Sequence, residues 1–299
     1  MSDITIGVDL GGTRIKAVAI NECGNILYQK FLDTNDGDDM IWKQAVSSVV
    51  LEIKDKIENA GSVIGISAPG LPNDSNSAIA YMPGRMKGLE NFIWTDFLEA
   101  KTFVLNDAIA AMMGEARAGA AKNKKNVVML TLGTGVGGAI LIDGKPYQGA
   151  FNKAGHIGHM VVDSDGDIDI TGMPGSLEDA IGNCSIAKRT SGKFSSTHQL
   201  LEAFRNGDSF AAEVWFTSVK KLAISLASLT NILSPEMIIL GGGITEAGND
   251  LFDPLEKYIA DYEWRTGGNR VEIVKARYGE LSGAVGVACY AKEAGNRSF

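Results

Sequence analysis

Two copies of one pattern, a short apolar strand followed by a glycine turn and another strand, constrain the fold of this 299-residue chain most strongly. The first copy begins at residue 4 and continues through two turns to a third predicted strand ending at residue 32. The second begins near residue 126, with a third predicted strand over 146–151. Two copies are fewer than a repeat array needs, so they predict a duplicated α/β unit with two lobes. We expect antiparallel hairpins in each copy and a ligand cleft between the lobes.

The rest of the chain alternates helices and strands. Apolar residues at three-to-four spacing predict a helix over 40–58, and an alanine-rich helix is predicted over 107–121 after a strand at 101–106. A long helix is predicted after Asp208, and the strand at 237–240 runs into Gly241-Gly242-Gly243. This alternation is typical of the α/β class.

Composition excludes several classes of protein. The chain has 28 basic and 36 acidic residues, a net charge of −8, so we expect no nucleic-acid partner. The three cysteines are widely separated, so they predict neither a disulfide framework nor a CxxC metal site. They are consistent with a reducing compartment. The sequence shows no basic leader and no uninterrupted apolar segment of membrane-spanning length. We therefore expect a cytoplasmic protein with no membrane partner.

The first glycine turn has the chemistry of an anion site. Asp9 ends a strand, Gly11 and Gly12 allow close backbone approach, and Thr13 adds a hydroxyl. An ordinary hairpin also uses Gly-Gly at its turn. The corresponding turn at 133–135 favours phosphate binding, because two similar turns can grip a nucleotide from both sides.

Two common nucleotide motifs are excluded. Residues 133–138 match G-x-G-x-x-G, but a strand follows them where the dinucleotide motif requires a helix. The sequence contains no G-x-x-x-x-G-K-[ST] motif, which excludes a P-loop NTPase. The glycines at 241–243 can admit a base or ribose, or form a plain strand-to-helix loop.

Seven motifs in order resemble the ROK (repressor, open reading frame, kinase) family of sugar kinases, from about residue 4 to 291. They are DLGGTRIK at 9–16, ISAPG at 66–70, LND at 105–107, GE at 114–115, LTLGTGVGGAILIDGK at 130–145, GHIGH at 155–159 and IILGGGI at 238–244.

The resemblance implies two ribonuclease-H-like lobes of the actin-like ATPase superfamily, with a central cleft. We expect residues 1–118 to form the N-terminal lobe, with a C-terminal helix at 282–299 packing back on it, and residues 119–281 to form the other lobe. It also implies a homodimer. The family's repressors carry a DNA-binding domain before the first phosphate turn; here that turn begins near residue 9, so we expect no such domain.

The resemblance assigns roles to individual residues. Asp107 matches the catalytic base and Asn106 a sugar ligand, although either residue type also caps helices. The expected ATP and magnesium residues are Asp9 (magnesium, through water), Gly11, Gly12, Thr13, Gly133, Thr134, Gly135, Gly241 and Gly242. The expected sugar-contacting residues are Gly70, Asn106, Asp107, His156, His159 and Glu178. Arg14 and Lys16 are expected either to solubilise the surface or to contact phosphate.

One departure from the family concerns structural zinc. Many members hold zinc with one histidine, at the position of His159, and three cysteines. Alignment places Asp169, Thr171 and Ser176 at the cysteine positions. This donor set suits zinc poorly, so we expect no zinc and a loop held by packing or hydrogen bonds. His159 is then expected to contact sugar.

Other departures concern the substrate. His156 replaces a sugar-binding glutamate, which changes the hydrogen-bond pattern, and residues 81–85 also differ from the family. We expect an ATP-dependent kinase of a hexose or hexose derivative, with glucose first and N-acetylmannosamine or another polyol as alternatives. A non-catalytic sugar or nucleotide sensor and an ATPase that needs no sugar are the competing hypotheses.

Overall fold

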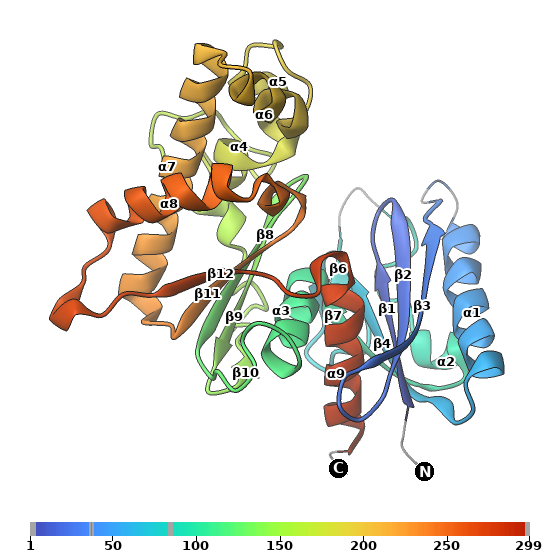
Figure 1. The fold of residues 1–299 in the computed structure, drawn as a ribbon. Helices are drawn as coiled ribbons and strands as arrows, with labels where there is room; N and C mark the ends of the chain where they lie inside the picture. Colours follow the sequence, from blue (N-terminus) through green and yellow to red (C-terminus); the bar gives the residue numbers. More distant parts are fainter. Residues whose placement is uncertain (1–3, 36, 38, 83–85, 297–299) are drawn as a thin grey trace. The chain divides into compact units, whose positions relative to one another are not determined.

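The computed structural model describes residues 4–35, 37, 39–82 and 86–296 (Figure 1). They form two compact units. The first contains the described residues up to Lys124, Gly144–Lys153 and those from Ala276 onward; the second contains Lys125–Asp143 and Ala154–Lys275. The first part of the first unit therefore extends to Lys124, a few residues beyond the boundary expected at 118. The unit also includes Gly144–Lys153, a segment expected in the other lobe.

The first unit is built on a sheet with the order β3-β2-β1-β4-β7. Its strands are β1 (Ile4–Leu10), β2 (Arg14–Ile20), β3 (Ile26–Asp33), β4 (Ala60–Ala68) and β7 (Lys101–Asn106). β1, β2 and β3 pair antiparallel, which confirms the predicted hairpins, whereas β4 pairs parallel with both β1 and β7. The short strands β5 (Leu71–Pro72) and β6 (Ile79–Tyr81) pair separately.

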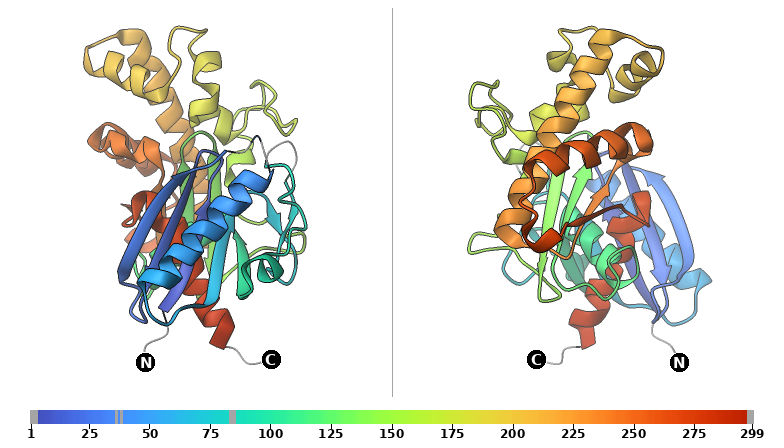
Figure 2. Two further views of the ribbon diagram at one scale, coloured as in Figure 1. Left: turned by 90° about the vertical axis from the view of Figure 1, so that its right-hand side faces the viewer. Right: turned by 60° about the vertical axis from the view of Figure 1, so that its left-hand side comes forward.

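Helices cover both faces of this sheet, as strand alternation requires. α1 (Asp39–Lys56) lies across one face (Figure 2, left), where Trp42 packs with Ile15 and other inward residues. On the other face, Val18 and Ile20 pack against α9 (Ser282–Asn296). α2 (Trp94–Leu98), α3 (Asp107–Arg117) and a 3₁₀ turn at Gly279–Leu281 complete the unit. α1 and α3 confirm the helices predicted over 40–58 and from 107.

The second unit repeats this arrangement. β9 (Val136–Ile142), β8 (Val127–Leu132), β11 (Met237–Gly241) and β12 (Glu272–Lys275) lie in this order. β8 pairs antiparallel with β9 and parallel with β11, and β11 pairs parallel with β12. The first sheet has the same pattern in β2-β1-β4-β7, which confirms the predicted duplication.

Helices of the second unit pack against one face of its sheet, where Leu130 and Ile238 lie in one core cluster with Leu222 of α7 (Ser209–Leu233). The helices are α4 (Leu177–Ile181), α5 (Ile186–Arg189), α6 (Thr197–Arg205), α7 and α8 (Asn249–Tyr262), with 3₁₀ turns at Ile157–His159, Asn183–Ser185, Gly243–Ala247 and Thr266–Gly268. Asp208 caps α7 by accepting a hydrogen bond from Ala211 N at 3.0 Å. Within the described ranges, no helix has the length and apolar character needed to cross a membrane.

The third strand predicted for the second copy, over 146–151, is present but much shorter than predicted. Only β10 (Lys145–Pro146) is a strand, and the chain then leaves the extended conformation. Pro146 lacks the N–H that a strand ladder uses, and Gly149 has φ +70°.

Helices α3 and α9 cross at very short range because glycines stand at the contact. A Cβ added to Gly286 would overlap Ala110 O, and one added to Gly114 would lie 2.7 Å from Ser282 O. The C-terminal helix therefore packs backbone against backbone on the helix that begins at Asp107.

We predict that Gly286→Ala destabilises the protein by about 1–3 kcal/mol, because the new methyl group has no room at the crossing. Urea unfolding measures this change. Gly295→Ala, in the last turn of the same helix, is the matched control, since its Cβ would lie 3.0 Å from a Val63 methyl group and the change gains helix propensity. Equal stabilities of the two variants would contradict the close crossing.

Candidate active site

Asp9, at the end of β1, is held in a fixed position. Its side chain is 12% exposed; Ser67 Oγ donates to Asp9 Oδ1 at 2.7 Å, and Lys16 Nζ donates to Oδ2 at 3.2 Å. A Cβ added to Gly283 would lie 2.8 Å from the carboxylate, so the first turn of α9 packs directly on Asp9. Lys16 is therefore an ion-pair partner of Asp9 and not a solubilising side chain, and sequence reasoning did not identify Ser67 as a partner.

The first glycine turn is anchored to the end of β3. Gly11 N donates to Arg14 O at 3.0 Å within the turn. Thr34 Oγ1 donates to Gly11 O at 2.7 Å, and Thr34 N donates to Thr13 O at 2.9 Å. Gly12 is half-buried and Thr13 is exposed at the tip, so the turn offers accessible backbone beside the strand that carries Asp9.

Asn106 is the N-cap of α3. Its Oδ1 accepts from Ala108 N at 3.0 Å and from Ile109 N at 3.3 Å, while its Nδ2 donates to Gly70 O at 3.0 Å. The capping alternative considered for the Asn-Asp pair is therefore correct for Asn106. The hydrogen bond from Asn106 Nδ2 also joins this residue to Gly70, as expected for two residues of one site.

Asp107 is the first residue of α3, and its carboxyl has a raised pKa. Oδ1 accepts from Ala108 N at 2.8 Å. The side chain is accessible to solvent, but surrounding protein desolvates the carboxyl and, with repulsion from Asp9 as the second cause, raises its pKa to about 6. At neutral pH the group is mostly ionised, and it is a better proton acceptor than an ordinary aspartate.

The second glycine turn is stabilised by contacts from α4 and the segment that follows it. Val136 N donates to Glu178 Oε2 at 2.8 Å, and a Cβ added to Gly135 would overlap that oxygen. Asn183 N and Cys184 N donate to Gly133 O and Thr134 O at 3.0 and 2.7 Å. Glu178, expected only near sugar, thus lies against the expected phosphate turn, and no sequence pattern marked the bonds from 183 and 184.

The glycines at the end of β11 lie beside this turn. Gly241 is paired with Thr131, and a Cβ on Gly242 would overlap Leu132 O. Around Gly133, by contrast, an added Cβ would have no neighbour within 4 Å. The second unit therefore brings together two glycine segments with open space over one of them, as phosphate binding requires.

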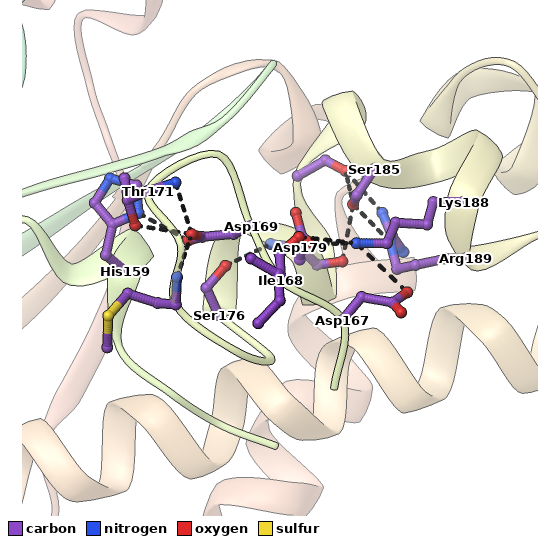
Figure 3. A network of polar contacts seen from close by, with 12 residues as sticks. His159, Asp167, Ile168, Asp169, Thr171, Ser176, Asp179, Ser185, Lys188 and Arg189 are labelled. Atoms are coloured by element: carbon purple, nitrogen blue, oxygen red, sulfur yellow. Dashed lines mark hydrogen bonds and ion pairs between the residues drawn. The ribbon is translucent and has the colours of Figure 1, made fainter. Parts of the chain in front are cut away.

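His159 lies in a polar network formed by the loop that follows it (Figure 3). His159 Nδ1 is 3.1 Å from Asp169 Oδ2, and Asp169 Oδ1 accepts from Thr171 N, Thr171 Oγ1 and Met173 N at 2.8, 2.7 and 3.0 Å. His156 is the N-cap residue of the 3₁₀ turn Ile157–His159 and is exposed. The turn packs directly on β9, because a Cβ on Gly158 would overlap Val136 O.

The residues at the family's zinc positions do not fit zinc. Burial of the Asp169 carboxyl would raise its pKa, but hydrogen bonds from Thr171, Met173 and His159 outweigh burial and hold that pKa well below its ordinary value. Ser176 is occupied elsewhere: its Oγ caps α4 by accepting from Asp179 N at 3.2 Å. Across the described part of the chain, no group of three or more His, Cys, Asp or Glu side chains can hold a metal ion.

Comparisons with known proteins show the family of the chain. The profile of the ROK family matches residues 5–294. The chain belongs to the ROK family. It is 31% identical to a glucokinase from Thermotoga maritima, covering 96% of this chain and 97% of that protein. It is 27% identical to an N-acetylmannosamine kinase from Yersinia pseudotuberculosis, covering 96% and 98%.

A solved ROK family glucokinase from Streptomyces griseus, in complex with glucose and AMPPNP, has a TM-score of 0.80 and 27% identity. The alignment covers 97% of this chain and 99% of that structure. This ROK chain therefore has the two-lobe, actin-like ATPase fold that its motifs predicted.

The predicted site residues of this ROK chain fall into two groups, one in each unit. The first unit holds Asp9, Gly11, Gly12, Thr13, Gly70, Asn106 and Asp107, and the second holds Gly133, Thr134, Gly135, His156, His159, Glu178, Gly241 and Gly242.

We predict that the purified protein contains no stoichiometric zinc, because the oxygens of Asp169 are occupied by hydrogen bonds. Elemental analysis after purification without chelator checks this, and EDTA should leave the melting temperature unchanged. One equivalent of zinc per chain, lost together with stability on EDTA treatment, would contradict it.

Proposed function

We propose that this chain is an ATP-dependent kinase that phosphorylates a hydroxyl of a hexose or hexose derivative, with glucose as the first candidate. The observation that carries the proposal is Asp107: an accessible carboxylate at a helix N-terminus, with a pKa raised to about 6, beside the N-cap residue Asn106 and near Asp9. The similarity to glucokinases supports this assignment over almost the whole chain.

Asp107 is the general base in this proposal. It accepts the proton of the attacking sugar hydroxyl, and its raised pKa brings its basicity close to neutral pH, where proton acceptance is most effective. Repulsion from Asp9 contributes to that pKa, so the two carboxylates have separate tasks. ATP supplies the phosphoryl group that is transferred.

Asp9 holds magnesium through water, while Lys16 and Ser67 fix the orientation of the carboxylate. The backbones of Gly11, Gly12, Gly133 and Gly135, with the hydroxyls of Thr13 and Thr134, bind the phosphates, and Gly241 and Gly242 flank the adenosine. The exposed tip of the first turn and the space over Gly133 support these roles.

Gly70, Asn106, His156, His159 and Glu178 contact the sugar in this proposal. Glu178 uses Oε2 to accept from Val136 N, and within the described residues its Oε1 accepts no hydrogen bond, which leaves that oxygen for a sugar hydroxyl. His156 replaces a carboxylate by an imidazole, so the bound sugar presents a different set of donors at that position.

N-acetylmannosamine is the second candidate substrate. The observation that favours it is the similarity to an N-acetylmannosamine kinase over 96% of this chain. A coupled ADP assay with glucose, mannose, N-acetylmannosamine and inositol separates the candidates. Turnover with one sugar identifies the substrate; turnover without sugar indicates an ATPase; and ATP binding without any turnover indicates a sensor.

A homodimer stays a prediction based on the resemblance, and a cytoplasmic location stays a prediction based on the composition of the sequence. Light scattering on the purified protein measures the oligomeric state directly.

We predict that Asp107→Ala lowers kcat at least about 10²-fold, the loss expected when a positioned base is removed. The affinity for ATP, measured by calorimetry, should change little because Asp107 touches the sugar. Asp55→Ala, an exposed carboxylate on α1, is the matched control and should retain full activity. Comparable turnover in both variants would remove Asp107 from its role.

We predict opposite pH dependences for activity and stability. Since Asp107 must be ionised to accept a proton, kcat/KM should fall with unit slope below about pH 6. The folded state raises the pKa above its ordinary 3.8 and thus favours the protonated form, so this group's contribution to stability is lost as pH rises through 4 to 6.

Asp107→Asn should therefore become more stable relative to the wild type as pH rises from 4.5 to 7.5, measured by urea unfolding. A stability difference independent of pH would contradict the raised pKa of Asp107.

A further inference from the structure

The Asp169 carboxylate makes four hydrogen-bonding contacts although it lies in a surface loop. Its side chain is fully buried; Oδ1 accepts from Thr171 N, Thr171 Oγ1 and Met173 N, and Oδ2 faces His159 Nδ1 at 3.1 Å (Figure 3). Three of the contacts shape the loop itself. The fourth reaches back to the 3₁₀ turn that carries His159.

The chemistry of this pair fixes the position of a proton. An ionised carboxylate only accepts hydrogen bonds, and the hydrogen bonds to Asp169 hold its pKa well below the ordinary value. The proton between the two groups therefore resides on His159 Nδ1. In the neutral imidazole, Nε2 is then a hydrogen-bond acceptor, which is the reverse of the tautomer that a histidine side chain favours in water.

The location of His159 connects this proton to the proposed site. Gly158 packs on Val136 O, and Val136 N donates to Glu178 Oε2 at 2.8 Å. Gly158, the residue next to His159, and Glu178 thus both contact Val136, at the start of β9. His159 and Glu178 then both present acceptors, Nε2 of the imidazole and Oε1 of the carboxylate.

A second contact holds the loop independently of Asp169. Lys188 Nζ donates to Asp179 Oδ2 at 2.8 Å and to Ile168 O at 3.3 Å, and lies 3.4 Å from Asp167 Oδ2 (Figure 3). The residues just before Asp169 are therefore tied to α4 and α5. This contact makes it feasible to change Asp169 without releasing the whole loop.

We propose that Asp169 is a positioning residue that holds His159 as the Nδ1–H tautomer, so that Nε2 accepts a hydrogen bond from a donor group of the sugar. The proposal rests on the proposed function in that a sugar is the molecule His159 contacts. It also specifies the substrate: the group facing His159 is a donor, a hydroxyl or an amide N–H, and not a ring or carbonyl oxygen.

The first test measures the tautomer without any sugar or ATP. Long-range ¹H–¹⁵N spectra of protein labelled at histidine distinguish a protonated from an unprotonated ring nitrogen, and the chain has three histidines. His156→Gln and His198→Gln assign the signals, and the exposed His198 on α6 serves as the solvent reference. We expect a proton on Nδ1 of His159 and none on Nε2; a proton on Nε2, with or without one on Nδ1, would overturn the proposal.

The second test uses Asp169→Asn with Thr171→Val as its matched control. The asparagine amide can donate to Nδ1 and thereby reverse the tautomer, so KM for the sugar should rise about tenfold or more while KM for ATP stays constant. Thr171→Val removes one bond to Oδ1 and retains the His159–Asp169 contact. It should keep both the tautomer and KM.

An equal rise of the sugar KM in both variants, with the tautomer unchanged in Thr171→Val, would show that loop order and not the proton position matters, and would overturn the proposal. Should Asp169→Asn fail to fold, the wild-type spectrum still decides. Absence of turnover with every sugar in the wild type would refute the proposed function alone, because the tautomer is measured in the free protein.

Discussion

The crossing of α3 and α9 governs the geometry of the first unit, and a buried carboxylate holds the two helices together. Glu115 on α3 is completely buried; its Oε1 accepts from Tyr278 N at 2.9 Å and Ser282 Oγ at 3.1 Å, and its Oε2 accepts from Ala120 N at 2.9 Å. Removing the hydrogen-bond donors of a buried carboxylate lowers the stability of the folded state, because nothing then replaces the hydrogen bonds that the group makes to water in the unfolded chain. The first turn of α9 is thereby fixed, and it packs on Asp9, while α3 carries Asp107 at its own start. One crossing between distant parts of the chain therefore positions both carboxylates.

That arrangement places the carboxylates of Asp9 and Asp107 near each other. Their repulsion is unfavourable for stability, but it makes Asp107 a better proton acceptor. Desolvation and Asp9 together raise the pKa of Asp107, whereas Asp9 is compensated by Lys16 and Ser67. Perturbed groups of this kind are concentrated at functional sites because a catalytic acid or base needs a pKa matched to its task. The difference between the two carboxylates thus lies in their partners and not in their residue type.

Sequence patterns predicted the repeated strands, the two glycine turns and the Asn-Asp pair because these depend on local features: alternation, turn residues and helix starts. The sequence did not reveal that Glu178 accepts a hydrogen bond from Val136 N or that Lys16 pairs with Asp9. It also did not reveal the backbone hydrogen bonds from Asn183 and Cys184 to the second glycine turn. These are contacts between residues far apart in the chain or on adjacent strands, and neither leaves a periodic signature. The strand predicted over 146–151 is shorter than expected for a local reason, because Pro146 lacks the N–H that continues a strand ladder and Gly149 has a positive φ.

Hydrogen bonds hold the loop around Asp169, where the sequence predicts that no zinc is bound. A structural zinc contributes about 10–16 kcal/mol in small metal-binding peptides, whereas each hydrogen bond contributes about 0.5–1.5 kcal/mol. The bonds to Asp169 and Lys188 therefore hold this loop far more weakly than a metal would, and local opening of the loop is correspondingly less costly. Ile168 and Ile170 extend into solvent, so packing adds little at these two positions. The loop is held mainly by polar contacts that depend on direction, and such contacts can orient the imidazole of His159. A metal bound to that ring would occupy one nitrogen. The Asp169 carboxylate instead fixes the proton on one nitrogen and leaves the other nitrogen to act as an acceptor.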